Sequence, residues 1–401
     1  MLTFLATGNP TGLKFTVEHG SARALFDFGR EHAPGRAPFS LGLEPRPGRE
    51  LEDLIAVGEA PRLDGVYRGW DGRTSVFISH LHLDHTGLVP FLAPEAPLYY
   101  PAEMEELRSA CAGSGYLQWR KPAGTPVPDR GTIRAGEIEV ELVAVDHDLP
   151  GATGFLIHTP DLALAYSGDH RWHGLRPELT AGFAEAAREV DVLILECVSL
   201  GGTAELERLS EAQVATRFEQ LLRRARGLVL VNLYPMNRER TAAFAQACNA
   251  AGRRFLMEPQ AAAVAGRREI LTDLSDVARD PAGHCVQLGF ESLPRLIDLR
   301  PPAGSIWVQS GGRPLGPFDP AAAVLSAWTE LFDLEVVPLE SSGHSYPADL
   351  MRMTRAVAPG VVLPVHSREP NRLVSGGIPM LVPTALRPYP AGELRSRRVR
   401  P

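Results

Sequence analysis

The sequence predicts an α/β protein in which a second α/β unit is inserted into the first. Strand-like segments dominate residues 1–196, and several of them alternate apolar and polar side chains, which is typical of β-strands. From residue 198 to about residue 335, helix-like and strand-like segments alternate, which indicates a parallel sheet covered by helices. With 401 residues and 44% hydrophobic content, the chain is long enough to bury a core in both units.

The first unit combines predicted strands with a long Pro/Gly-rich stretch. That stretch, from about residue 31 to residue 73, contains one predicted helix, ELEDLIAVG. The other predicted elements are, in order, the strands LTFLAT, GLKFTVEHG, ARALFDFG and TSVFIS, the helix EMEELRSACAG, and the strands EIEVELVAV, GFLIHTP, LALAYSG and VDVLILE. We expect GFLIHTP and LALAYSG to pair as a hairpin with Pro160–Asp161 as its turn.

The second unit begins with a long amphipathic segment. Its predicted elements are, in order, a helix over 210–226, the strand LVLVNL, a helix over 238–251, the strands RRFLM and SIWVQS, and a helix over 321–332. The chain then continues with the strand LEVVPL, a helix over 347–357 and the strand VVLPVH. We therefore predict one domain from residues 1–197 and 336–401, and an inserted domain from residues 198–335.

Composition and charge restrict the class of protein. Lys and Arg number 41 and Asp and Glu number 48, so the net charge is −7. This charge is unlike that of a strongly basic nucleic-acid-binding protein. An acidic protein can still carry a local basic groove. The four cysteines form no CxxC pair, which favours a reducing compartment. There is no apolar run of about 20 residues and no basic segment before the short apolar N-terminus. We predict a cytoplasmic protein with no membrane partner.

A histidine-rich loop carries the strongest chemical signal. The segment SHLHLDHTG, residues 79–87, follows the predicted strand TSVFIS and holds four ligand-type side chains within six residues: His80, His82, Asp84 and His85. Imidazole nitrogens and carboxylate oxygens are the ligands expected at a zinc or manganese site. Three of the chain's 12 histidines crowd into this loop, which makes a polar loop without a metal role a poor explanation.

Three further candidates end predicted strands, where a fold can bring them together. They are His147, Asp169 and His366. Each taken alone would more often be a structural residue, but the order His-x-His-x-Asp-His, His, Asp, His supplies three ligands per ion and a shared carboxylate. It also leaves room for a bridging hydroxide, the usual nucleophile of a two-metal hydrolase.

Three residues near these candidates have different expected roles. Asp27 also ends a strand and could orient a metal ligand through a hydrogen bond. His170 and His173 follow Asp169 but do not end a strand, so we interpret them as surface or rim residues.

SHLHLDHTG resembles the signature loop of the metallo-β-lactamase superfamily, and FDFG, DHDLPGATGFLI and YSGDH resemble its flanking motifs in the same order. The resemblance covers residues 1–196 and implies an αββα sandwich. It also implies that His80, His82 and His147 hold one ion, that Asp84, His85 and His366 hold a second, and that Asp169 bridges them. We expect two divalent cations, with Zn²⁺ favoured and Mn²⁺ as the alternative.

Three later segments resemble motifs A, B and C of the β-CASP branch, which contains ribonuclease J and the mRNA 3′-end processing nucleases. They are LILECVSLGG, with Glu196 at a strand end, SGHSYP, with His344 before a helix, and PVHSREPNRL, with His366 22 residues after His344. VNLYPMNRERTAAFAQACNAAGRRFLM and SIWVQSGGRPLG also resemble segments of ribonuclease J. The resemblance implies that residues 198–335 form a β-CASP domain inserted into a catalytic domain.

Phosphodiester hydrolysis needs a nucleophile, charge neutralisation and help for the leaving oxygen. We assign catalytic roles to Asp84, His344 and Glu196. At the start of a helix, His344 would hold a phosphate oxygen or protonate the leaving group, and Glu196 would orient it.

Substrate contacts are the least specific part of the prediction. Gln309, Ser310, Gly311 and Gly312 could form a backbone nest for a phosphate, or they could be an ordinary strand-to-turn glycine pair. Arg238 could contact substrate or lie on a solvated helix face.

The leading hypothesis is a ribonuclease J-like β-CASP nuclease that cleaves RNA, with single-stranded DNA as a second substrate. The alternatives are a metallo-hydrolase of a small phosphodiester or ester, and a non-catalytic RNA-binding subunit. The expected partner is a nucleic acid, RNA rather than DNA. The sequence leaves open the mode of cleavage and the oligomeric state, with a homodimer as one alternative.

Overall fold

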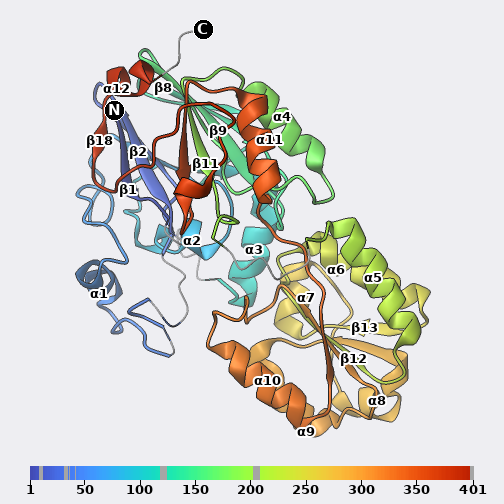
Figure 1. Cartoon of the computed structure of the whole chain (residues 1–401). Coiled ribbons are helices and arrows are strands. Elements are labelled where there is room, and N and C mark those ends of the chain that lie inside the picture. Colours follow the sequence, from blue (N-terminus) through green and yellow to red (C-terminus); the bar gives the residue numbers. More distant parts are fainter. Residues whose placement is uncertain are drawn as a thin grey trace.

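A computed structural model describes residues 1–8, 12–30, 35, 37–40, 42–117, 124–201 and 208–397 of the chain. Within these residues the strands form three sheets, of seven, six and five strands. Two of them lie together in one part of the molecule, and the third lies in a separate part formed by the middle of the sequence (Figure 1). No helix among the described residues is long and apolar enough to cross a membrane.

The first sheet contains the N-terminal strands. Its order is β18-β1-β2-β3-β4-β5-β6. The strands are β1 (Leu2–Ala6), β2 (Lys14–His19), β3 (Ala22–Phe26), β4 (Thr74–Phe77), β5 (Leu98–Pro101), β6 (Thr125–Val127) and β18 (Pro388–Tyr389). Pairing is antiparallel from β18 to β3 and parallel from β3 to β6.

The second sheet has the order β17-β11-β10-β9-β8-β7. Its strands are β7 (Thr132–Ala135), β8 (Ile138–Ala144), β9 (Thr153–Thr159), β10 (Leu162–Tyr166), β11 (Val192–Glu196) and β17 (Val361–Val365). β9 and β10 pair antiparallel, so the predicted hairpin is confirmed. β11 pairs parallel with β10 and with β17, which brings the end of the chain back beside residue 196.

These two sheets face each other across one apolar core. Phe4, Phe15 and Phe26 from the first sheet are buried in the same cluster as Phe155 and Tyr166 from the second. The outer face of the first sheet is covered by α1 (Glu50–Val57) and α3 (Glu105–Ser114), and that of the second by α4 (Pro177–Ala186) and α11 (Pro347–Val357). The arrangement is the predicted αββα sandwich, which is therefore confirmed. The helix α4 was not predicted.

The third sheet is wholly parallel, with the order β13-β14-β12-β15-β16. Its strands are β12 (Val229–Leu233), β13 (Arg254–Leu256), β14 (His284–Gln287), β15 (Ile306–Ser310) and β16 (Glu335–Pro338). Helices α5 (Glu211–Arg224), α6 (Arg238–Ala250) and α7 (Pro259–Ala265) cover one face, and α8 (Leu274–Arg279), α9 (Leu296–Leu299) and α10 (Ala321–Leu331) the other.

Several details of this unit differ from the sequence prediction, since helices α7, α8 and α9 were not predicted. The strand β14 was not predicted, because its four residues, HCVQ, are too few to show a clear alternation of apolar and polar side chains. The strand β16 pairs with β15, so the third sheet continues past residue 335, where we predicted the inserted domain to end.

Candidate metal centre

The histidine-rich loop lies between a strand and a short helix. β4 ends at Phe77, and α2 (Leu83–Thr86) begins three residues after His80. The Ser79 backbone N–H and hydroxyl both donate to the Asp27 carboxylate, at 2.8 and 2.9 Å. Gly29 allows the Asp27 loop to approach closely, because a Cβ there would lie 1.5 Å from the Asp84 carbonyl oxygen. The loop is thus fixed from both sides.

One group of ligand-type atoms gathers around His82. Its Nδ1 lies 3.0 Å from Nε2 of His80 and 3.2 Å from Nε2 of His147. Together with a carboxylate oxygen of Asp169, these atoms all lie within 4.8 Å of one another. Three imidazole nitrogens and a carboxylate at this separation are suited to hold one metal ion.

A second group lies on the other side of Asp169. It contains Asp84, His85 and His366, again within 4.8 Å of one another. Oδ2 of Asp169 lies 3.2 Å from Nε2 of His85 and 3.4 Å from Nε2 of His366, and it lies 3.6 Å from Nε2 of His80 in the first group. One carboxylate oxygen therefore faces both groups, and the structure brings together all seven predicted ligands.

Several of these atoms are buried without a hydrogen-bond partner. They are both carboxylate oxygens of Asp169, Nε2 of His85 and Nε2 of His366. Buried polar atoms in proteins are nearly always satisfied, so a group of orphaned atoms of this kind requires a ligand. Nitrogen and carboxylate oxygen are the donors that divalent transition metals bind, and the residues present fit such ions.

Charge differs between the two groups: burial lowers the pKa of His85 and of His366, but the neighbouring carboxylates outweigh it and raise both, that of His366 to about 10. Burial raises the pKa of the Asp169 carboxyl, but the imidazoles of His85 and His366 outweigh it and leave that pKa well below its usual range. Burial lowers the pKa of His80 well below its ordinary value. An ionised carboxylate and a neutral imidazole are the forms that bind a metal.

The second nitrogens of His85 and His80 are held by partners outside the cluster. Nδ1 of His85 lies 2.8 Å from Asp27 Oδ2, which also accepts from the Tyr166 hydroxyl at 2.7 Å. Nδ1 of His80 lies 3.0 Å from the Ser79 hydroxyl. These contacts direct each Nε2 into the cluster. Asp27 therefore contacts His85, and its role in orienting a metal ligand stays a prediction.

His147 is held in the same way by the segment before α11. Its Nδ1 donates to the carbonyl oxygen of Gly343 at 2.5 Å. Gly343 must be a glycine at this approach, since a Cβ there would lie 2.8 Å from the His147 ring. This contact links the segment that carries His344 to the first ligand group.

His344 lies beside the cluster with Glu196 and Asp169 on one side of its ring. Its Nδ1 is 3.6 Å from Glu196 Oε2 and 3.7 Å from Asp169 Oδ2. Burial lowers the pKa of His344, but the two carboxylates outweigh it and the pKa is raised. The predicted helix over 347–357 is confirmed as α11, and His344 lies three residues before it.

The residues predicted to bind substrate make contacts within the protein. The hydroxyl of Ser310, fully buried, donates to the Leu339 carbonyl at 2.6 Å. A Cβ at Gly312 would meet the Asn232 side chain at 2.0 Å, and Gly311 has a positive φ of 82°. Arg238 donates to Glu106 at 2.8 Å and to the Val264 carbonyl at 2.9 Å. The functional groups of Ser310 and Arg238 are therefore already engaged within the protein.

Two residues near the centre were misjudged or missed. His170, which we interpreted as a surface or rim residue, is fully buried, because the backbone of Ser345 packs over it and donates to its carbonyl at 2.7 Å. His173 is only partly exposed and stacks on Tyr346, with ring centroids 4.0 Å apart. Asp148 was not singled out, yet its Oδ1 lies 3.4 Å from Nε2 of both His82 and His147. Its position next to His147 was the available signal.

Comparison with known proteins agrees with this architecture. Residues 58–228 match the family described as the β-lactamase superfamily domain. The match covers much of the αββα sandwich, runs on through α5, and contains six of the seven clustered ligand-type residues. By its fold and by this match, the chain is thus similar to the metallo-β-lactamase superfamily.

More particular similarities are to proteins named Ribonuclease J. The chain is 25% identical over 324 residues to that of Mycolicibacterium smegmatis, covering 73% of this chain and 58% of the relative. It is 25% identical over 330 residues to that of Mycobacterium tuberculosis, covering 74% and 58%. It is 30% identical over 132 residues to that of Pyrococcus abyssi, covering 30% and 29%. The chain spans 58% of the length of the first two relatives.

A solved structure extends the likeness to nearly the whole chain. It is a protein of unknown function from Enterococcus faecalis V583, with a TM-score of 0.82 and 26% sequence identity, covering 96% of this chain and 98% of that one. These comparisons confirm the predicted resemblance to the metallo-β-lactamase superfamily and to its ribonuclease J-like members.

Proposed function

We propose that this protein is a metal-dependent phosphodiester hydrolase, a ribonuclease J-like β-CASP nuclease that cleaves RNA. The observation that carries the proposal is the position of Asp169 Oδ2, within 3.7 Å of histidines from both ligand groups and of His344. A shared carboxylate between two ligand groups is suited to a pair of divalent ions, and a histidine beside it is suited to proton transfer. The likeness to proteins named Ribonuclease J supports RNA as the substrate.

Seven side chains would hold the two ions. His80, His82 and His147 would bind one, Asp84, His85 and His366 the other, and Asp169 both. Histidine-rich sites favour zinc, and manganese is the second candidate. When bound, such ions supply Lewis-acid stabilisation and lower the pKa of bound water.

His344 and Glu196 would handle the proton of the leaving oxygen. Both carboxylates near His344 face its Nδ1, so the proton on that nitrogen is directed toward Glu196 and Asp169. Nε2 is then the atom from which a proton passes to the leaving oxygen. Asp169 and Glu196 stabilise the charged ring that makes this donation possible, since they raise the pKa of His344. Asp148, beside His82 and His147, would orient the first ligand group.

We also propose that residues 1–197 and 339–401 form the catalytic domain and residues 198–338 a β-CASP domain, so the later boundary lies after β16 and not at the predicted residue 335. The cytoplasmic location and the oligomeric state stay predictions.

The test is a substrate panel run on the full chain with zinc and with manganese. Single-stranded RNA with varied 5′ ends, single-stranded DNA of the same sequence, and a small chromogenic phosphodiester are digested side by side. We expect metal-dependent cleavage of RNA at a higher kcat/KM than that of DNA. Turnover of the small diester without cleavage of RNA would favour the small-substrate hydrolase, and RNA binding with no hydrolysis under either metal would favour the non-catalytic subunit.

A further inference from the structure

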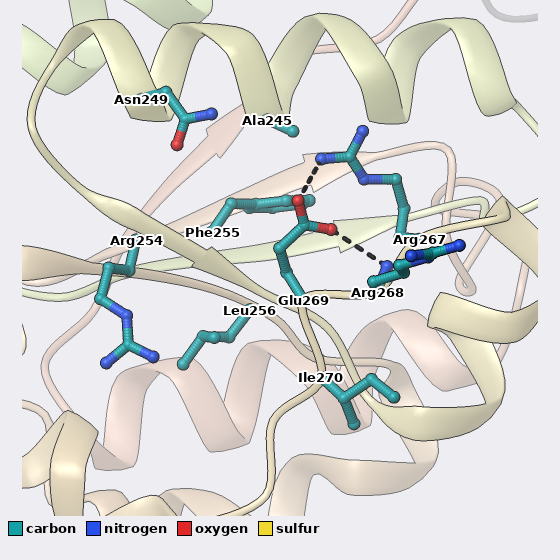
Figure 2. Close-up of a pocket in the computed structure, with 9 residues that line it drawn as sticks. All are labelled: Ala245, Asn249, Arg254, Phe255, Leu256, Arg267, Arg268, Glu269 and Ile270. Carbon is teal, nitrogen blue, oxygen red and sulfur yellow. Dashed lines mark hydrogen bonds and ion pairs between the residues drawn. The ribbon is translucent and has the colours of Figure 1, made fainter.

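A cavity of about 290 Å³ opens at the edge of the third sheet. It is lined by the end of α6, by the edge strand β13, and by residues 267–270, which run beside that strand through a single bridge between Met257 and Ile270 (Figure 2). All of its lining residues lie between 245 and 270, and none belongs to the two ligand groups. Its volume is at the small end of the range for ligand pockets, roughly 300–1,000 Å³, which suits a single small ligand unit.

The lining carries an excess of positive charge. The lining contains three arginines, Arg254, Arg267 and Arg268, and one carboxylate, Glu269. Glu269 pairs with Arg267 at 2.8 Å and accepts from the backbone N–H of Arg268 at 3.1 Å, as Figure 2 shows. Within the described part of the chain, the guanidinium groups of Arg254 and Arg268 make no ion pair, and Nε of Arg267 is buried without a hydrogen-bond partner. Unpaired guanidinium groups at a cavity are suited to an anion, and phosphate matches their geometry.

The rest of the lining is apolar. Phe255, Leu256 and Ile270 form the part nearest β13, and Asn249 adds one neutral amide. A free inorganic ion would gain nothing from these apolar side chains. A phosphate joined to a flat, partly apolar group would contact both the arginines and the apolar side chains. We propose that the cavity binds a nucleotide, with its phosphate at a lining arginine and its remaining part against the apolar side chains of the lining. The nucleotide is either free or one unit of a bound RNA strand, because the chemistry of recognition is the same.

Binding measurements on the full chain as purified test this proposal without relying on cleavage. The probes are 5′-AMP, followed by calorimetry, and a fluorescent 2′-O-methyl oligoribonucleotide that resists hydrolysis. The double variant Arg254→Glu with Arg268→Glu should bind at least one probe about tenfold or more weakly, since it replaces two charge-assisted hydrogen-bond donors by repulsive groups. Loss of both affinities identifies an RNA strand as the source, and loss of the 5′-AMP affinity alone identifies a free nucleotide.

A matched double variant controls for net charge. Arg226→Glu with Arg300→Glu makes the same change of charge at two exposed arginines of the same unit that line no part of the cavity. It should leave both affinities within about twofold of the wild type, as expected of screened surface charges. Equal affinities in the two double variants would overturn the proposal. If the variant Arg254→Glu with Arg268→Glu has a lowered melting temperature, the variant Arg254→Gln with Arg268→Gln is measured in its place. This outcome is independent of whether the protein is a nuclease.

A second inference concerns His170, and it rests on the proposed function. The ring is fully buried, and neither of its nitrogens has a hydrogen-bond partner. Nδ1 of His170 lies 3.6 Å from Oε1 of Glu196, while Oε2 of Glu196 accepts from the Val198 N–H at 3.0 Å and faces His344. The Glu196 carboxylate thus lies between two imidazoles. We infer that His170 is a positioning residue, whose Nδ1 faces Oε1 at 3.6 Å and keeps Glu196 turned toward His344.

Two substitutions separate positioning from packing. His170→Leu removes both nitrogens, whereas His170→Asn keeps an amide N–H close to the place of Nδ1. On single-stranded RNA we expect His170→Leu to lower kcat about 10- to 100-fold with KM and metal content unchanged, as for other residues that orient a working side chain, and His170→Asn to restore most of the rate.

A purely structural role gives a different pattern. Replacing an unsatisfied buried polar group by an apolar one can leave stability unchanged or raise it, so a loss of rate without a loss of melting temperature supports positioning. Wild-type kcat in His170→Leu, or the same loss in both variants, would overturn it. An inactive wild type would instead contradict the proposed function.

Discussion

Nδ1 of His344 lies 3.6 Å from Oε2 of Glu196, and both side chains lie outside the two ligand groups. The two residues come from different parts of the sandwich, Glu196 from the end of β11 and His344 from the segment before α11. β11 and β17 are parallel neighbours, so Glu196 pairs with Val365 and lies beside the strand end that carries His366. The acid, the proposed proton donor and one metal ligand thus converge through the sheet itself.

His344→Ala should lower turnover on single-stranded RNA by about 10²–10⁴-fold, the usual range for loss of a general acid or base. Metal content and melting temperature should stay at wild-type values, since the ring is not within either ligand group. The checks are single-turnover kinetics, elemental analysis and thermal melting. His19→Ala is the control, a partly exposed histidine on β2 that faces only Glu137 and Asp161. A folded, fully metallated His344→Ala with unchanged turnover would remove His344 from the mechanism.

The metal content is the next prediction. Protein purified without chelator should contain close to two divalent ions per chain, zinc in preference to manganese, because seven ligand-type atoms form two groups with one shared carboxylate. Chelation should abolish hydrolysis and lower the melting temperature, since the orphaned atoms of His85, His366 and Asp169 lose their ligand. Elemental analysis well below one ion per chain, with no activity regained on adding zinc or manganese, would contradict a metal centre.

Asp169→Ala should lose at least one ion and reduce turnover by more than about 10²-fold, which is the upper end of the effect of removing an orienting partner alone. The reason is that its Oδ2 faces both ligand groups. Asp161→Ala, at the other end of the same strand in the exposed β9–β10 turn, is the matched control and should behave as wild type. His170, the residue after Asp169, is unsuitable as a control because its ring is buried beside Glu196. Normal metal content in Asp169→Ala would show that Asp169 is not a shared ligand.

The sequence predicted the sandwich and the ligand cluster well, for a physical reason. Four ligand-type residues lie within six positions of the loop after β4, so local spacing alone brings them together. His147, Asp169 and His366 follow strands that pair in one sheet, and strand ends are visible in the pattern of apolar residues. Resemblance to a known family then supplied their pairing.

The misjudged residues depend on long-range contacts that no local pattern contains. His170 is buried by a segment 175 positions away, since it accepts from the backbone of Ser345. Ser310 is engaged by Leu339, and Arg238 by Glu106, a residue 132 positions earlier in the chain. A glycine pair and an arginine at a helix start have the same sequence signature whether they meet a phosphate or a neighbouring loop.

The last prediction concerns a buried charge cluster between the sandwich and the third-sheet unit. Glu211, at the start of α5, accepts from Arg171 at 2.6 Å and from Arg240 Nε at 3.1 Å, and both arginines are buried. Glu211→Gln should lower the free energy of unfolding by about 3–5 kcal/mol, because it leaves two buried guanidinium groups with less opposing charge. Glu219→Gln on the same helix removes only an exposed contact of 3.9 Å to Arg223, and should cost no more than about 1 kcal/mol.

The difference in free energy of unfolding between wild type and Glu211→Gln should become smaller as the pH falls. Burial raises the pKa of Glu211, but Arg240 and Arg171 outweigh it, so the folded-state pKa lies below the ordinary value of 4.5. A group whose pKa is lowered by folding stabilises the protein fully above its unfolded-state pKa, and that stabilisation is lost as the pH falls through the folded-state pKa. Urea unfolding should therefore give a constant difference in the free energy of unfolding between about pH 6 and 8. Below the ordinary pKa of 4.5 this difference should become smaller. A difference that grows on acidification would show that the Glu211 carboxylate is not the stabilising form.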